Sequence, residues 1–247
     1  MQRGFFVAGN ANQMAQNKLN DISHNLANAN TVGFMAHRTA FSTVFTAANQ
    51  SSSTPEQTPA GYLSLNRQFT DTGKGIMTYT KSQLDFAIQG DAFFQVKTEE
   101  GKDALTRGGN FTMDGSGRLM TQSGYAVLDD AGQPITVPAG EISAAANGTL
   151  YADGEPFATL GLVSLKDPAK VAVRHGVLLL TPKDNITEPS AHVSVRQGAL
   201  EESNVNSILA MTELIDVMRS SQSMMKVVEI YNQQASLLND RVGLVQG

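Results

Sequence analysis

Histidines are the side chains most often used for metal binding and for proton transfer near neutral pH. The chain of 247 residues has four of them, at His24, His37, His175 and His192. No two follow the spacing of a zinc-binding helix, in which two histidines are separated by three residues. We interpret all four as structural or solvent-facing residues, and the sequence predicts no metal site.

Three glycine-containing segments resemble functional motifs, but each lacks essential positions. Gly115-Ser116-Gly117 lacks the frame of a nucleophile elbow and is typical of a hairpin turn. Gly73-Lys74-Gly75 has neither the upstream glycine nor the following Ser or Thr of a phosphate loop. Asp129-Asp130-Ala131-Gly132 has too few alternating carboxylates for a calcium loop. The sequence predicts no catalytic residue and no cofactor, so a hydrolase is the weakest alternative.

Composition excludes several classes of partner. The net charge is −5 and the basic residues do not cluster, so we expect no nucleic acid partner. The chain has no cysteine, which excludes disulfides and thiolate metal sites. No apolar run approaches the roughly 20 residues that span a bilayer, so we expect no direct membrane insertion. The apolar patch at residues 5–8 is too short for a cleavable signal peptide, and we expect any export to use another route.

The longest periodic segment runs from about Val205 to Val245, and its apolar residues recur at a period close to 3.5. This period is typical of a helix that presents a seam to another helix. The main row comprises Val205, Ile208, Ile215, Met218, Met225, Val228, Ala235, Leu238, Val242 and Val245. A second row lies beside it and comprises Leu209, Leu214, Val217, Met224, Val227, Tyr231 and Leu237. So wide an apolar surface predicts two or more neighbours.

The methionines of this helix admit two interpretations. Met211, Met218, Met224 and Met225 form either an ordinary buried stripe or a surface that contacts non-equivalent neighbours in an assembly. Both are open because methionine is flexible and adapts to irregular packing surfaces.

A second helix is predicted from about Phe5 to Asn28. Its apolar row is sparse and consists of Ala8, Ala15, Leu19, Ile22, Leu26 and Ala29. Asparagine recurs along it, and asparagine side chains compete for backbone hydrogen bonds. We therefore expect that neither terminal helix is stable alone, and that each needs the other or copies from neighbouring subunits. Gly33 follows as a helix terminator.

Between the helices the period changes to two at Leu84–Ile88, as in a half-buried strand. Further short strands are predicted at Phe93–Lys97, Asn110–Met113, Arg118–Thr121, Tyr125–Leu128, Ile135–Val137, Phe157–Leu165, Val177–Thr181 and His192–Gln197. Short strands spaced by glycine-containing turns are typical of an antiparallel sandwich or a small barrel. Gly198 is predicted to end this pattern, and Ser203-Asn204 to cap the long helix.

These elements predict an α+β fold. The two terminal helices would pair as a coiled-coil stalk, and the chain between them would form a central antiparallel β-rich domain. Residues 1–34 and 203–247 would form a terminal helical assembly domain, and 84–198 the central β domain. Residues 35–83 would connect them, with a polar segment at 49–60 that is typical of a flexible linker or a surface loop.

Four segments resemble the bacterial flagellar rod and hook protein family. The first spans residues 25–34 and matches the family signature at Asn25, Leu26, Ala27, Asn28, Asn30, Thr31, Gly33 and Phe34. Leu84–Phe94 and Leu105–Phe111 resemble the β domain of the family, and Gln197–Asn206 resembles its C-terminal signature. One departure is Met35, where the family usually carries Lys or Arg, and it indicates a changed local contact.

The resemblance implies a structural subunit of the flagellar drive shaft, which transmits torque. Members of the family leave the cell through the flagellar type III export channel without a cleaved signal and assemble in the periplasm, with paired terminal helices inside and β lobes outside. The implied partners are other proximal and distal rod subunits, further copies of the chain and the export apparatus. Length and the short linker favour a proximal over a distal rod subunit. A secreted β-rich binding module is the other alternative, although such modules rarely need terminal helices.

We predict that apolar residues of both terminal helices contact neighbouring subunits. These subunit-interface residues are Leu19, Ile22, Leu26, Val205, Ile208, Ile215, Met218, Met225, Val228 and Leu238. Because their apolar faces exceed what one chain can cover, we expect the helices to be loose in the free monomer and to become ordered on stacking beside other subunits.

Overall fold

The computed structural model describes residues 2–45, 61–174 and 177–243, and the polar segment 49–60 lies outside them. The fold is α+β, as predicted: the two terminal helices contact each other, and the residues between them form antiparallel β structure. The chain divides into two compact units. A helical unit contains Met1–Leu26, His37–Gln68 and Ser207–Gly247, and a β unit contains Ala27–Ala36 and Phe69–Asn206.

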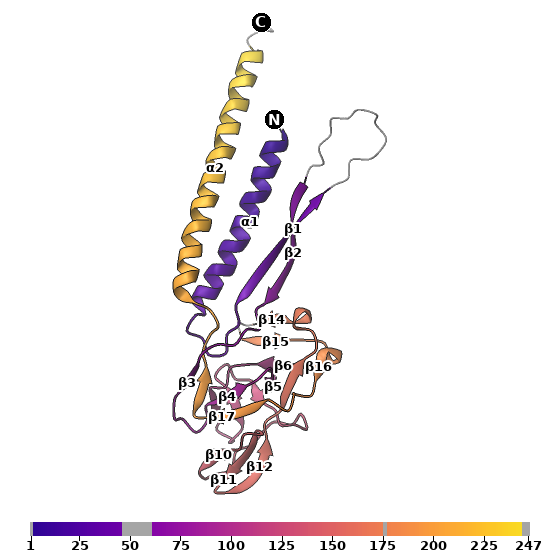
Figure 1. The fold of residues 1–247 in the computed structure, drawn as a ribbon, viewed down its shortest axis with the longest axis vertical. Coiled ribbons are helices and arrows are strands. Elements are labelled where there is room, and N and C mark those ends of the chain that lie inside the picture. The colour runs from indigo at the N-terminus through magenta and orange to yellow at the C-terminus, as the bar shows by residue number, and fades with distance from the viewer. Residues whose placement is uncertain (1, 46–60, 175–176, 244–247) are drawn as a thin grey trace. The chain divides into compact units, whose positions relative to one another are not determined.

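The helical unit contains α1 (Gln2–Ala27), α2 (Ser207–Gly243) and the paired strands β1 (His37–Phe45) and β2 (Gly61–Thr70). The two helices run in opposite directions (Figure 1): residues late in α1 contact residues early in α2. With 37 residues against 26, α2 continues beyond the first turn of α1.

The β unit is built from short strands, and its strand pairs are antiparallel throughout the described registers. Its main sheet has the order β14-β15-β6-β5-β9-β8-β7, with β13 joined to β5 and β16 joined to β13; β10-β11-β12, β17-β4 and β18-β3 form smaller sheets. The strands are β3 (Met77–Tyr79), β4 (Phe86–Gln89), β5 (Phe93–Lys97), β6 (Asp103–Thr106), β7 (Phe111–Met113), β8 (Leu119–Thr121), β9 (Ala126–Val127), β10 (Ile142–Ala144), β11 (Thr149–Ala152), β12 (Glu155–Thr159), β13 (Leu162–Leu165), β14 (Ala172–Arg174), β15 (Leu178–Leu180), β16 (Ile186–Thr187), β17 (Ser194–Gln197) and β18 (Ala199–Glu201). Two single-turn 3-10 helices, η1 (Pro168–Lys170) and η2 (Lys183–Asn185), lie in its connections.

The β unit has a well-packed core. Phe111 lies between two other aromatic rings, with ring centroids 5.9 Å from Phe86 and 5.1 Å, edge to face, from Phe94. A second cluster joins Met35 to Leu105, Phe93, Val163 and Leu179. Met35 is only 6% exposed, so the residue that departs from the family pattern is a core residue here.

Several sequence predictions differ from the structure. Residues Phe86 to Ile88 are all buried, so β4 does not alternate between core and solvent. Within Ile135–Val137 only Thr136 forms an isolated bridge, to Arg118, and no strand is present. Leu160 and Gly161 separate β12 from β13. The predicted connector 35–83 contains β1, β2 and β3.

The prediction that Gly198 ends the β pattern is wrong, because β18 follows it directly. The predicted cap is also wrong, because α2 begins at Ser207 and the Asn204 side chain binds other backbone groups. In both cases the chain forms long-range contacts that local turn chemistry does not encode.

Candidate assembly site and its supporting contacts

One stripe of α2 packs against α1 within the chain. The least exposed residues of α2 that the structure describes recur at intervals of three and four: Ser207, Ala210, Leu214, Val217, Ser221, Met224 and Val228. Two side-chain contacts set the register. Lys18 Nζ lies 2.7 Å from a Glu213 carboxylate oxygen, and the Ser221 hydroxyl donates to Asn12 Oδ1 over 2.9 Å. Ser221 is buried, so a shifted helix register would break its hydrogen bond to Asn12 and leave a buried hydroxyl without that partner. The pair therefore favours the observed register.

A second stripe of α2 is apolar and exposed. It comprises Ile208, Met211, Ile215, Met218 and Met225, which are 75%, 51%, 51%, 45% and 49% exposed. We call these five residues the apolar row. Four of them belong to the predicted seam. The chain covers the neighbouring row only in part, because Leu214, Val217 and Met224 are partly buried whereas Leu209, Val227 and Leu237 are exposed. Contiguous exposed apolar surface is typical of an interaction site.

The other predicted interface residues are placed differently. Ile22 is buried at 5% exposed, and Leu19, Leu26 and Val228 are partly buried, so these side chains have less surface to offer a neighbour. Val205 precedes α2. The side chain of Leu238 lies outside the described set.

A groove of about 480 Å³ runs between α1 and α2. Its lining is Ala11, Met14, Ala15, Lys18, Glu213, Asp216, Val217, Ser220 and Met224. Small alanines on α1 leave this space open, and its surface is mainly apolar with charged groups near the Lys18–Glu213 ion pair. It is a recess suited to apolar side chains.

The family signature begins at a contact between α1 and β1. The Asn25 side chain accepts a hydrogen bond from the backbone N–H of His37 and donates one to its carbonyl oxygen, each over 2.8 Å. The His24 and His37 rings lie 4.6 Å apart between centroids. Burial and then the neighbouring His24 lower the pKa of His37, while Asp21 opposes the shift. This end of the helical unit therefore favours neutral His37.

The rest of the signature forms a tight turn in the β unit. Ala27 and Asn30 are exposed, whereas the Thr31 hydroxyl donates to Asn28 Oδ1 over 3.2 Å. Gly33 has a φ of 67°, and a Cβ there would overlap the backbone nitrogen of Gly108. Both constraints require glycine. After this turn Phe34 is 1% exposed, so the signature encodes a backbone path into the β core.

The four segments that carry the family resemblance meet around one buried ion pair in the β unit. Arg107 Nε donates to Glu201 Oε2 over 2.6 Å, and both side chains are 4% exposed. Arg107 also donates to the carbonyl oxygens of Ala92 and, over 3.1 Å, Ile88. The Glu201 carbonyl accepts a 2.8 Å hydrogen bond from the Gly33 N–H. One ion pair thus links all four segments.

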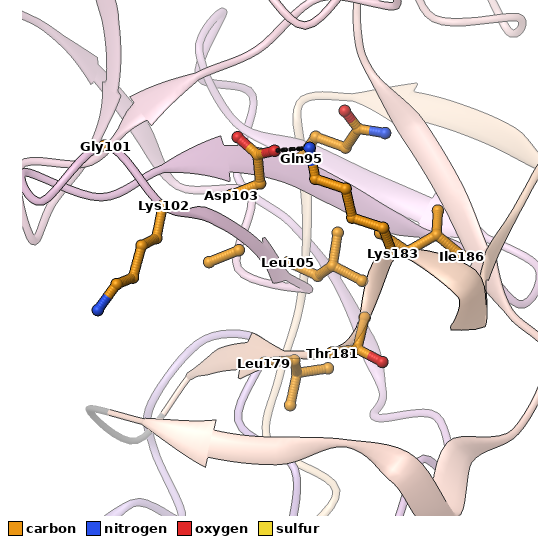
Figure 2. Close-up of a pocket in the computed structure, with 10 residues that line it drawn as sticks. Gln95, Gly101, Lys102, Asp103, Leu105, Leu179, Thr181, Lys183 and Ile186 are labelled. Atoms are coloured by element: carbon orange, nitrogen blue, oxygen red, sulfur yellow. Dashed lines mark ion pairs between the residues drawn. The ribbon is translucent and has the colours of Figure 1, made fainter.

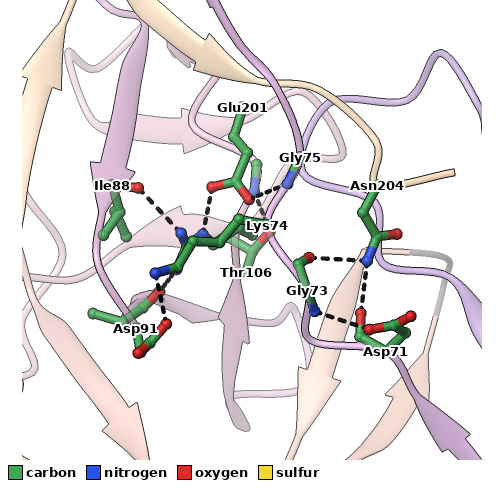
Figure 3. Close-up of polar contacts among 12 residues, drawn as sticks. Asp71, Gly73, Lys74, Gly75, Ile88, Asp91, Thr106, Glu201 and Asn204 are labelled. Atoms are coloured by element: carbon green, nitrogen blue, oxygen red, sulfur yellow. Dashed lines mark hydrogen bonds and ion pairs between the residues drawn. The ribbon is translucent and has the colours of Figure 1, made fainter.

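Neighbouring polar contacts extend this arrangement (Figure 3). The Gly75 N–H donates to Glu201 Oε1 over 3.0 Å, and Asn204 Nδ2 donates to the carbonyl oxygens of Asp71 and Gly73 over 2.8 and 2.9 Å. Asn204 Oδ1 accepts a 2.8 Å hydrogen bond from the Ala36 N–H. These contacts position the residues just before α2 within the β unit.

Sequence reasoning missed Arg107, Glu201 and Asn204 as structural determinants. A usable signal was present at Arg107, because a cation followed by Gly108-Gly109 interrupts an otherwise apolar strand end. Buried charges occur almost only when they are paired, but the sequence does not identify the partner.

A second cavity, of about 550 Å³, lies in the β unit (Figure 2). Leu105 and Leu179 line it, and at its rim Lys183 Nζ lies 3.5 Å from an Asp103 carboxylate oxygen. Lys102 at the same rim pairs with Glu100 over 2.7 Å. Since carboxylates already balance both lysines, this cavity has no concentrated charge to select a ligand.

Within the described residues, no group of three or more His, Asp or Glu side chains is arranged to hold a metal ion. The same part of the chain has no helix with enough length and apolar character to cross a membrane.

Three family models match the chain, each over one part of it. Residues 5–34 match the flagella basal body rod protein model, 87–155 the flagellar hook protein FlgE/F/G D1 domain, and 196–241 the flagellar basal body rod FlgEFG protein C-terminal model. The chain is 40% identical over 225 residues to the flagellar basal-body rod protein FlgF of Rhizobium meliloti strain 1021, and the match covers 89% of each chain. It belongs to the FlgF family of flagellar basal-body rod proteins.

Further relatives include both FlgF and FlgG rod proteins. The FlgF protein of Escherichia coli K12 is 31% identical over 258 residues, covering 99% of this chain and all of the relative. The FlgG rod protein of Caulobacter vibrioides is 32% identical over 250 residues, covering 90% and 94%. FlgF-family chains are structural rod subunits, not enzymes, so the predicted membership of the flagellar rod and hook protein family and the predicted structural role are confirmed.

Proposed function

We propose that this FlgF-family subunit builds a proximal part of the flagellar rod in the periplasm, where its terminal helices pack with those of other rod subunits and of further copies. The observation that carries the proposal is the apolar row of α2, whose residues are 45% to 75% exposed although the β unit buries most of its large apolar side chains. Packing by neighbouring helices would remove this surface from water, at about 25 cal/mol per Å².

Helix packing would also explain torque transmission. Each helix alone is marginal, but a closely packed layer of helices is stiff because its side chains interdigitate. The subunit would reach this site through the flagellar export apparatus without a cleaved signal peptide. Its loosely held helices would suit passage through a narrow channel.

A position in the distal rod is the second candidate, and the similarity to a FlgG protein favours it. An electron-microscopy map of the basal body, with this chain located along the rod axis, would distinguish the two positions.

The proposal is tested by Ile215→Asp, which places a charge in the middle of the apolar row. Desolvating that carboxylate in a helix interface is costly, so we expect the variant to be absent from isolated basal bodies and its cells to be non-motile. Thr212→Asp, at an exposed position of α2 outside the row, is the matched control and should assemble. Purified Ile215→Asp should unfold with the same β-unit transition as the wild type. Full motility of this variant would contradict the proposal.

A further inference from the structure

The apolar row and the α1–α2 groove lie on opposite flanks of the helical unit. Successive residues of an α-helix differ by about 100° in direction. On α2 the mean direction of the row therefore lies roughly 170° from that of the groove-lining residues, with the stripe that contacts α1 between them. One flank thus presents protruding apolar side chains, and the other presents a recess.

The groove flank is itself suited to an apolar partner. Besides its lining, the same flank of α2 carries Leu209 and Val227, which are 67% and 44% exposed. A helix seated in the groove would cover both. The methionines of the row suit such an irregular recess because their side chains are unbranched and adapt to the available space.

The outward-facing edges of the two flanks carry charges of opposite sign, although the exposed Glu229 lies in line with the apolar row. Arg219 and Lys226 are exposed and lie beside the apolar row on the side facing away from α1. Asp216 is exposed on the side of the groove that faces away from α1. When a row enters a groove, these outward-facing edges meet, and the cations of one partner approach the carboxylate of the other.

We propose that the apolar row of one copy packs into the α1–α2 groove of the next copy of this chain. The proposal rests on the proposed rod function and adds which two faces meet. The contact joins different surfaces, so it repeats from copy to copy and generates a ring or a helical array instead of a closed pair. A symmetric row-to-row contact would instead leave Leu209 and Val227 uncovered and would place Arg219 and Lys226 of two copies close together.

Engineered disulfides test this pairing, because the chain has no cysteine of its own. Ser220→Cys, in the groove, is combined in turn with Met211→Cys, Ile215→Cys, Met218→Cys or Met225→Cys in one chain. Ser220 and the row residues point in nearly opposite directions from α2, so they cannot form a bridge within one chain, because a disulfide needs Cα atoms within about 7 Å and facing Cβ atoms. Isolated basal bodies are oxidised mildly and run on a non-reducing gel. We expect dimers, trimers and larger multimers for at least one combination.

Controls separate the possible contacts. Each row cysteine alone, and Ser220→Cys combined with Thr212→Cys on another face of α2, should stay largely monomeric. Dimers from a row cysteine alone would show that the row faces itself and would overturn the proposal. Monomers from every combination, in basal bodies that contain the chain, would overturn it as well.

The presence or absence of the chain in those basal bodies tests the proposed function separately. If the chain is absent, the rod role fails, and the same oxidation of the concentrated purified chain decides the contact. Multimers there would support row-to-groove packing, and monomers would exclude it.

Discussion

The β unit and the helical unit bury their apolar side chains to very different extents. In the β unit Phe86 and Phe94 are 1% and 0% exposed, whereas on α2 Ile208 and Leu209 are 75% and 67% exposed. The β unit completes its core within one chain, although Ile76 and Tyr79 on its surface are 75% and 70% exposed. The helical unit leaves a large share of its apolar surface to be covered by other molecules, which agrees with its membership of a family of rod subunits.

The largest expected effect comes from breaking the ion pair that joins the segments of the β unit. Arg107→Met leaves the Glu201 carboxylate buried without its cation, and removal of one partner from a buried pair costs about 3–5 kcal/mol. We expect the free energy of unfolding of the β unit to fall by that amount, measured by denaturant titration of the purified chain.

Two variants serve as controls for this prediction. Lys102→Met removes an exposed ion pair with Glu100 and should leave the unfolding midpoint nearly unchanged. Adding Glu201→Met to Arg107→Met removes the stranded charge and should recover part of the loss. Equal midpoints for Arg107→Met and the wild type would mean that the pair does not hold the β unit together.

A second prediction compares the two units in the free monomer. We expect amides of α1 and α2 to exchange with solvent roughly tenfold to hundredfold faster than those of β5 and β6, because the helices share few buried contacts. Hydrogen exchange followed by mass spectrometry measures this difference, and the helices should become protected in isolated rods. Strong protection of both terminal helices in a monomer would count against assembly-dependent order.

The smallest expected effect is a pH dependence confined to the helical unit. Burial, together with His24, lowers the pKa of His37 in the folded chain, whereas the unfolded chain titrates near pH 6.5. As the pH falls below about 6.5, the unfolded state therefore binds a proton at His37 before the folded state does. The folded state loses stability over this range, until the pH has also fallen below the lower pKa of folded His37. We expect the helical circular dichroism signal to melt at a lower temperature at pH 5.5 than at pH 7.5.

His37→Gln should reduce this pH dependence, because glutamine does not titrate. His192→Gln replaces an exposed histidine of the β unit and should leave it unchanged. If the melting temperature of His37→Gln depends on pH as strongly as that of the wild type, the effect comes from another group.

Local sequence patterns predicted the main elements well. A period near 3.5 identified α2, which begins two residues after the predicted start at Val205, and β5 has the predicted bounds Phe93–Lys97. Predictions failed where long-range contacts override local signals. Asn204 has the composition of a helix cap, but its amide binds Asp71, Gly73 and Ala36 instead, and β18 exists because β3 pairs with it.

The sequence by itself determined the α+β class, the family and the excess of apolar surface on the C-terminal helix. Periodicity and signature segments are local properties of the chain, so they can be recognised without coordinates. Only the tertiary structure decided which residues of the two rows pack on α1 and which stay exposed, because both rows have the same 3.5-residue period. It also decided that Arg107 pairs with Glu201, since a buried charge signals the need for a partner but not its position in the chain.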